Sequence, residues 1–342
     1  MAKIRARKGS PYARILGVGG YRPVRVVPNE VILETIDSSD EWIRSRSGIA
    51  TRHWASDEET VAAMSIEASG KAIADAGISA EQIGAVVVST VSHFAQTPAI
   101  ATEIADRLGT DKAAAFDISA GCAGFGYGLT LAKGMVVEGS AEYVLVIGVE
   151  RLSDLTDLTD RATAFLFGDG AGAVVVGPAD EPHIGPTVWG SEGDKAGTIT
   201  QTVSWDRYRG DLSGLARDAD GNVKFPAITQ EGQAVFRWAV FEMAKVAKEA
   251  LDAAGITADE LDVFIPHQAN MRIIDSMVKT LKLPESVTVA RDIETTGNTS
   301  AASIPLAMER LLATGQAKSG DTALVIGFGA GLVYAATVVT LP

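Results

Sequence analysis

Apolar residues along the chain fall into two alternating patterns. Short uninterrupted runs rich in β-branched residues, such as AVVVST at 85–90 and VLVIG at 144–148, are typical of strands buried on both faces. The segments between them, such as the one that stops at Gly77, repeat apolar residues every three or four positions and indicate amphipathic helices. This alternation predicts an α/β protein with mixed, mostly parallel sheets covered by helices.

Three segments of the first half recur in the same order in the second half. They are 72–83 with 250–261, 144–148 with 323–327, and 167–176 with 328–339. The offset is 178 or 179 residues for the first two pairs and 161 for the third, which predicts an insertion in the first half at about 149–166. We therefore expect two homologous halves, 1–180 and 181–342.

Two further segments are apolar on nearly every side, which predicts helices without a solvent-facing surface. They span 122–137 and 300–313 and correspond at an offset of 178, so Cys122 and Ser300 are expected to be counterparts. The natural packing places both helices between the two sheets. The first helix carries three glycines near its start, each costing about 1 kcal/mol relative to alanine, and close approach of the two helices would explain that cost.

Composition then excludes several classes of protein. The 342 residues carry 30 Lys and Arg against 43 Asp and Glu, a net charge of −13, whereas nucleic-acid-binding proteins present a basic face. A single cysteine excludes a disulfide framework within the chain, and no histidine spacing predicts a metal site. Residues 322–342 lack charge over a membrane-spanning length, but glycines divide them into two strand-like runs. We expect a soluble, cytoplasmic protein with no secretory signal.

Three polar residues lie where the predicted elements meet. Cys122 stands at the start of the first buried helix, where the helix N-terminus favours thiolate over thiol. His267 ends a strand in FIPHQAN, and Asn298 precedes the second buried helix in TTGNTSAAS. Each also has a structural explanation, as a small buried apolar residue, a core histidine and a helix cap. The duplication brings all three between the halves, which matches an activated nucleophile.

Six motifs in one order resemble the β-ketoacyl-acyl-carrier-protein synthase III family of the thiolase superfamily. They are SSDEWIRSRSGIATRH, GCAGF, FGDGAG, HQAN, GNTSAAS and GFGAG, and the resemblance runs from about residue 12 to the C-terminus. The family implies a thiolase-like, five-layered αβαβα fold from two duplicated halves, which agrees with the repeat found in the residues. It also implies a homodimer.

The resemblance implies a decarboxylative Claisen condensation. Cys122 would take an acyl group from an acyl-CoA primer. His267 and Asn298 would hold the thioester carbonyl of malonyl-acyl carrier protein as it loses CO2 and becomes an enolate, which then attacks the acyl-cysteine. The backbone N–H groups of Cys122 and Ala330 would meet the oxyanion of the acyl-transfer steps, at a position where the family usually has glycine in place of Ala330.

The same resemblance implies the substrate and partner sites. Trp42 and Arg161 match residues around the CoA adenine, and Arg46 matches a residue that meets the phosphates. Acyl-CoA is a substrate, and no permanently bound cofactor is implied. The carrier is acidic like this chain, so docking needs a local basic patch. The residues expected to form it are Arg272 at the family's carrier-contact position, Lys279 and Lys282 on the same predicted helical face, and Arg237, Lys245 and Lys248 on the preceding helix.

One position bears on the choice of primer. Some acetyl-preferring relatives have a Phe that reaches across the dimer interface and closes the acyl pocket, whereas this chain has Thr97. The smaller side chain predicts a pocket for branched short or longer acyl groups. Three other activities stay open: an acyltransferase of secondary metabolism on the same scaffold, a Cys-His-Asn thioester hydrolase, and a non-catalytic binding module.

Overall fold

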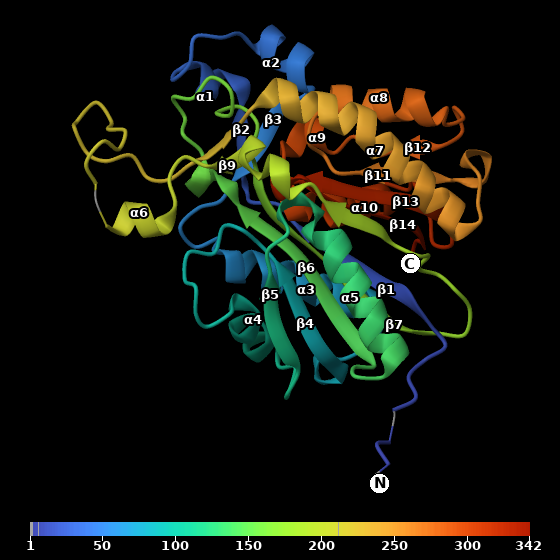
Figure 1. Cartoon of the computed structure of the whole chain (residues 1–342). Helices are drawn as coiled ribbons and strands as arrows, with labels where there is room; N and C mark the ends of the chain where they lie inside the picture. The colour runs from blue at the N-terminus through green and yellow to red at the C-terminus, as the bar shows by residue number, and fades with distance from the viewer. Residues whose placement is uncertain (1–2, 6, 211) are drawn as a thin grey trace.

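Two five-stranded sheets with the same strand order form the frame of the protein. The computed structural model describes residues 3–5, 7–210 and 212–342 (Figure 1). The first sheet has the order β1-β7-β6-β4-β5 and the second the order β8-β14-β13-β11-β12. The first contains Tyr12–Tyr21 (β1), Ile83–Ser89 (β4), Ala114–Ile118 (β5), Tyr143–Arg151 (β6) and Asp169–Ala179 (β7). The second contains Val188–Ser191 (β8), Val263–Pro266 (β11), Thr288–Val289 (β12), Thr322–Gly329 (β13) and Val333–Thr340 (β14).

The sheets are mixed, as predicted, but they are not mostly parallel. Each has two parallel and two antiparallel pairings. Antiparallel pairing follows where a connection is too short for a crossover, and only Ala330–Leu332 (η7) joins β13 to β14. The equivalent strands β6 and β7 are joined by residues 152–168, which overlap the insertion predicted at 149–166. We propose that the two halves divide between β7 and β8, near residue 180.

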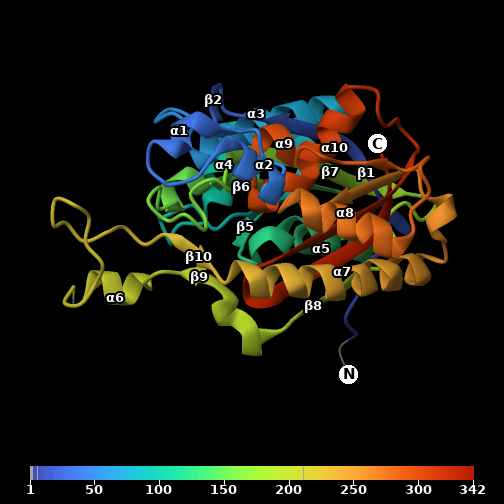
Figure 2. The same cartoon turned by 90° about the horizontal axis from the view of Figure 1, so that it is seen from above.

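Six helices complete the layers around the sheets. Gly124–Glu138 (α5) and Ser303–Ala313 (α10) share one apolar core with strands of both sheets, which confirms the two predicted buried helices. Val61–Asp75 (α3) and Ile100–Leu108 (α4) cover the outer face of the first sheet, and Gly232–Ala254 (α7) and Met271–Leu281 (α8) cover the second. Figure 2 shows α5 and α10 between the outer helix layers. The five-layered αβαβα arrangement is therefore confirmed.

Smaller elements gather at one end of the molecule (Figures 1 and 2). They are Arg25–Pro28 (β2), Asn29–Leu33 (α1), Asp40–Ser47 (α2), Thr51–Trp54 (β3), Ile199–Gln201 (β9), Trp205–Arg209 (α6), Ile228–Gln230 (β10) and Ile293–Thr296 (α9). Residues 322–342, which have the length of a membrane span, contain β13 and β14 as predicted. Among the described residues, no helix combines the length and apolar character needed to cross a bilayer.

The glycines at the start of α5 serve contacts with strands rather than the predicted contact between the two helices. A Cβ on Gly126 would lie 2.8 Å from the Cβ of Ala335 in β14, and a Cβ on Gly128 would lie 2.8 Å from Cγ1 of Val146 in β6. The helix is thus pressed between both sheets, and side chains at these two positions would push the layers apart.

The entrances of the two buried helices correspond at an offset of 179, not 178. Each begins with a short 3-10 turn, Gly121–Ala123 (η2) and Ser300–Ala302 (η6), and each turn opens with a residue of positive φ, Gly121 and Ser300. Ser300 is therefore the counterpart of Gly121, and the predicted pairing of Cys122 with Ser300 is wrong. The strands β6 and β13 also correspond at the offset of 179. The second half therefore has one more residue than the first between the repeated segment 250–261 and its buried helix.

Candidate active site

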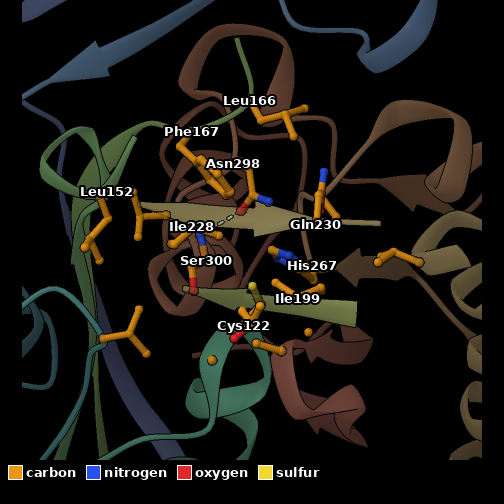
Figure 3. A pocket seen from close by; sticks show the side chains of 18 of the residues that line it. Cys122, Leu152, Leu166, Phe167, Ile199, Ile228, Gln230, His267, Asn298 and Ser300 are labelled. Atoms are coloured by element: carbon orange, nitrogen blue, oxygen red, sulfur yellow. Dashed lines mark hydrogen bonds between the residues drawn. The ribbon is translucent and has the colours of Figure 1, made fainter. Parts of the chain in front are cut away.

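A cavity of about 1200 Å3 lies where the entrances of both buried helices meet. Cys122 in η2, His267 directly after β11, and Asn298 just before η6 all line it. Figure 3 shows their side chains converging on the same space. The structure thus brings together the three residues that the sequence analysis selected, from segments far apart in the chain.

Cys122 lines this cavity and is partly buried as a residue. A Cβ on Gly329 would lie 2.9 Å from its Sγ, so glycine is what lets β13 pass beside the sulfur. The next residue, Ala330, has its backbone nitrogen 3.4 Å from the position a Cβ on Gly121 would take. The backbone nitrogen of Ala330 therefore lies against the turn that carries Cys122.

The surrounding protein desolvates the thiolate and raises the pKa of Cys122 to about 12. A hydrogen bond with Ser300 acts in the opposite direction, and the negative charge of Glu150 adds to the increase. The position of Cys122 at a helix N-terminus predicts a thiolate; instead burial dominates, because η2 is covered by both halves. Cys122 rests as a thiol.

His267 is fixed on three sides and only 2% exposed. Its backbone N–H donates to the carbonyl of Ile326 at 2.7 Å, its Nδ1 lies 2.7 Å from Oγ of Ser303, and the ring of Phe328 meets it edge-on at 5.4 Å between centroids. Burial lowers the pKa of His267 to about 3, so the imidazole is neutral at physiological pH. A neutral imidazole has one N–H donor and one acceptor nitrogen.

The carboxamide of Asn298 is oriented by its own chain. Its Oδ1 accepts a hydrogen bond from the N–H of Ser300 at 2.8 Å, drawn as a dashed line in Figure 3. Its backbone bonds to Leu166 and Gly168 across a short parallel bridge. The residues at the N-cap positions of η6 and α10 are Thr299 and Ala302, so the predicted role of Asn298 as a helix cap is wrong. The bond to Ser300 leaves the Nδ2 amide group of Asn298 to serve as a donor toward the cavity.

The three residues matched to CoA binding lie together, and two of them line the same cavity. Trp42 and Arg46, one turn apart on α2, both line it. The guanidinium carbons of Arg46 and Arg161 lie 5.8 and 5.1 Å from the centroid of the Trp42 ring, and Phe165 supports the ring edge-on at 5.5 Å. An aromatic face between two cations suits a ligand that is both aromatic and anionic.

The basic residues matched to the carrier divide into two groups. Arg237 of α7 and Arg272 of α8 line the cavity, and the guanidinium carbon of Arg272 lies 4.9 Å from the Phe236 ring centroid. The others lie away from the cavity: Lys245, Lys248, Lys279 and Lys282 are exposed. The prediction that Lys282 lies on the same helical face as Arg272 and Lys279 is wrong. The helix α8 ends at Leu281, and the left-handed φ of 53° at Lys282 turns the chain away from that face.

Thr97 is exposed and does not line the cavity within one chain, although its neighbours Ala95 and Gln96 do. Its predicted action across a dimer interface stays a prediction. Among the described residues, no group of three or more His, Cys, Asp or Glu side chains is arranged to hold a metal ion.

Two buried groups beside the site were not selected from the sequence. Ser303 touches His267, and its signal lies in the GNTSAAS motif itself. Glu150 is fully buried at the end of the VLVIGVE run and accepts hydrogen bonds from Ser92 Oγ at 2.7 Å and from the N–H of Val91 at 3.1 Å. Burial raises the pKa of Glu150 to about 7. The feature of the sequence that could have identified Glu150 is a carboxyl side chain at the end of an otherwise apolar strand.

Comparison with known proteins places this geometry in a family. The model of 3-oxoacyl-[acyl-carrier-protein (ACP)] synthase III matches residues 116–193, and the model of its C-terminal part matches 251–341. β-Ketoacyl-[acyl-carrier-protein] synthase III 1 of Streptomyces avermitilis is 87% identical and that of Streptomyces coelicolor 88% identical, each over the whole of both chains.

Solved structures agree with this placement. The priming β-ketosynthase from the R1128 polyketide biosynthetic pathway is 47% identical, with a TM-score of 0.95 over 100% of this chain and 99% of its own. 3-Oxoacyl-[acyl-carrier-protein] synthase III from Aquifex aeolicus is 36% identical, with a TM-score of 0.85 over 96% and 99% of the two chains. The chain thus has the thiolase-like fold and belongs to the β-ketoacyl-acyl-carrier-protein synthase III family.

Proposed function

We propose that the protein joins an acyl-CoA primer to malonyl-acyl carrier protein by decarboxylative condensation, giving the 3-ketoacyl-acyl carrier protein that initiates fatty acid or polyketide synthesis. The observation that carries the proposal is the convergence of Cys122, His267 and Asn298 on one cavity. The names of its relatives support the same reaction. No permanently bound cofactor is needed, because the primer arrives as its CoA thioester.

In the first step, the sulfur of Cys122 attacks the acyl carbonyl of acyl-CoA. A bond forms between that sulfur and the acyl carbon, the bond to the CoA sulfur breaks, and the thiol proton passes to the departing CoA. The N–H groups of Cys122 and Ala330 stabilise the oxyanion that forms in between. Because burial holds Cys122 as a thiol, the proton leaves only as the attack proceeds.

In the second step, malonyl-acyl carrier protein loses CO2 and its thioester becomes an enolate. His267 and Asn298 donate hydrogen bonds to the enolate oxygen, where the negative charge develops. The enolate carbon attacks the acyl-Cys122 thioester, a carbon–carbon bond forms, and the cysteine leaves as a thiolate that takes a proton from solvent. A neutral His267 suits this role, since it donates a hydrogen bond without carrying charge.

The binding roles follow the arrangement at the cavity. Trp42 holds the adenine of CoA together with Arg161, and Arg46 meets the phosphates. The acidic carrier docks over the basic residues of α7 and α8, led by Arg272 at the cavity. We place the protein in the cytoplasm as a homodimer in which Thr97 of one chain faces the acyl pocket of the other.

Intact-protein mass spectrometry after mixing with a panel of acyl-CoAs tests the first step. Wild-type protein should gain the mass of one acyl group, and Cys122→Ala should gain none. The second step predicts CO2 release from malonyl-acyl carrier protein that falls by about 100-fold or more in Asn298→Ala, the usual effect of losing one oxyanion donor. Free acid as the main product would instead indicate a hydrolase, and transfer to a hydroxyl or amine would indicate the other acyltransferase.

A further inference from the structure

We propose that Ser303 is a positioning residue that holds the His267 imidazole as the Nε2–H tautomer and aims this N–H at the reacting thioester. The inference rests on the proposed function, because it concerns the donor that meets the enolate. Ser303 itself does not touch the substrate, since it is 1% exposed and does not line the cavity.

The contacts of the Ser303 hydroxyl define its role. Ser303 is the first residue of α10, and its Oγ lies 2.7 Å from Nδ1 of His267. The backbone N–H of Gln268 donates to the same oxygen at 3.3 Å. Within the part of the chain that the structure describes, no other acceptor lies within hydrogen-bonding distance of this hydroxyl.

Counting protons then selects one tautomer. If Ser303 donates its single hydroxyl proton to Nδ1 of His267, both the hydroxyl proton and Nδ1 have a partner and the proton of the imidazole sits on Nε2. If Nδ1 carried the proton and donated it to Ser303, the hydroxyl proton would be buried without an acceptor, which costs about 1–3 kcal/mol. The first arrangement is the stable one, and it leaves the Nε2–H free to donate.

The surroundings of this pair are rigid. The side chain of Gln268 donates from Nε2 to the carbonyl of Pro266 at 2.7 Å and accepts at Oε1 from the N–H of Ile293 at 3.1 Å. These bonds hold the peptide that donates to Ser303. The edge-on contact of Phe328 restrains the plane of the imidazole. The ring therefore has one orientation and one tautomer, which preorganises the donor.

The other half of the molecule has the same contact without this chemistry. At the offset of 179, Ser303 corresponds to Gly124, and at 178 His267 corresponds to Ser89. A Cβ on Gly124 would lie 1.7 Å from Oγ of Ser89, so these two positions also touch. The Oγ of Ser89 has no hydrogen-bond partner among the described residues. The hydrogen bond between a serine at the start of the buried helix and His267 is therefore a feature of the second half. The corresponding Gly124 of the first half has no side chain that could form such a bond.

The test joins a spectroscopic and a kinetic readout. In wild-type protein with 15N-labelled histidine, the His267 signals, assigned by their loss in His267→Asn, should show a proton on Nε2 and an acceptor nitrogen at Nδ1. In Ser303→Ala, this pattern should be lost, and CO2 release from malonyl-acyl carrier protein should fall by roughly 10- to 100-fold, the value of one such hydrogen bond. Acylation of Cys122 should be unchanged.

Two further variants separate positioning from structure. Ser303→Thr keeps the hydroxyl and should restore both the tautomer and most of the CO2 release. Ser69→Ala removes a buried serine hydroxyl that has no partner among the described residues, in α3, and should change neither. A proton on Nδ1 in the wild type, an unchanged rate in Ser303→Ala, or equal loss of acylation and CO2 release in that variant would each overturn the inference. A wild-type protein that acylates but releases no CO2 would contradict the proposed function instead.

Discussion

Cys122 and His267 owe their protonation states mainly to burial. The pKa of the thiol is raised and that of the imidazole is lowered, so both groups are neutral near pH 7. A neutral pair cannot rely on a preformed thiolate–imidazolium ion pair. In the proposed mechanism, N–H donors from the backbone and from Asn298 are instead directed at the points where charge develops.

Glu150 makes the pH dependence of acylation testable. With the pKa of Cys122 at about 12, negative charge builds on its sulfur only as the proton leaves during the attack, so the thiol itself should make the acylation rate depend little on pH between about pH 6 and 9. Glu150, with a pKa of about 7, becomes charged within this range and opposes the thiolate. In Glu150→Gln that opposition is absent, so acylation should be faster than in the wild type, by a factor that grows as the pH rises through 7.

Quenched single-turnover acylation followed by mass spectrometry measures this difference. Asp169→Asn is the matched control, since Asp169 is another buried carboxyl with a pKa raised to about 6, and it bonds Ser153 and Ala55 rather than the site. Its profile should follow the wild type. Identical profiles for Glu150→Gln and the wild type would rule out the electrostatic coupling.

Residue identities at the site could be predicted from the sequence, whereas their protonation could not. Cys122, His267 and Asn298 stand at element boundaries that the apolar pattern already marks. The direction of the Cys122 pKa depends on how much protein covers η2 from the opposite half, which local sequence does not contain. Ser303 was missed for a related reason, because its partner is 36 residues away.

At the scale of elements, α5 offers a direct test of the packing between the sheets. Gly126→Ala adds a methyl group 2.8 Å from Ala335 and should reduce the free energy of unfolding by about 1–3 kcal/mol. Gly134 lies on the same helix with no atom within 4 Å of an added Cβ, so Gly134→Ala should raise it by about 0.5–1 kcal/mol. Urea unfolding followed by circular dichroism measures both; changes of the same sign would contradict the packing described.

The elements themselves follow the sequence pattern closely, but their pairing and register do not. Buried strands in a fully covered sheet are apolar throughout, whether their neighbours are parallel or antiparallel, so the excess of parallel pairs was a wrong expectation. The predicted counterpart of Cys122 was wrong by one residue. Sequence similarity between Ala- and Gly-rich segments is too unspecific to reveal a single inserted residue. Both errors concern relations between elements.

For the whole molecule, the net charge of −13 opposes an acidic partner, so docking depends on the local cations. Arg272→Glu should raise the KM for malonyl-acyl carrier protein roughly tenfold, since a like charge replaces an attraction, and should leave Cys122 acylation by acyl-CoA intact. Lys318→Glu, in the exposed loop between α10 and β13, makes the same change in net charge and should have little effect. Equal loss of both steps in Arg272→Glu would refute docking at this residue.

The primer prediction also belongs to the assembled molecule, because Thr97 lies outside the cavity of its own chain. We expect isobutyryl-CoA to compete well with acetyl-CoA, since each extra buried CH2 contributes about 0.8 kcal/mol. Thr97→Phe should shift the preference toward acetyl-CoA. The measurement is the ratio of the two acyl-Cys122 adducts from an equimolar mixture. Strict acetyl preference in the wild type would refute the prediction.

The repeated sheet order has a consequence for the origin of the site. Two identical halves packed through their central helices would form a symmetric pair, with equivalent helix entrances on either side of a twofold axis. In this chain the equivalence is broken: one entrance presents Cys122, and the other presents Asn298 and the serine behind His267. We propose that the two halves descend from copies joined in a single polypeptide, where each could mutate independently. The cysteine nucleophile and the groups that stabilise the enolate could then specialise separately, a division of labour that identical subunits cannot reach.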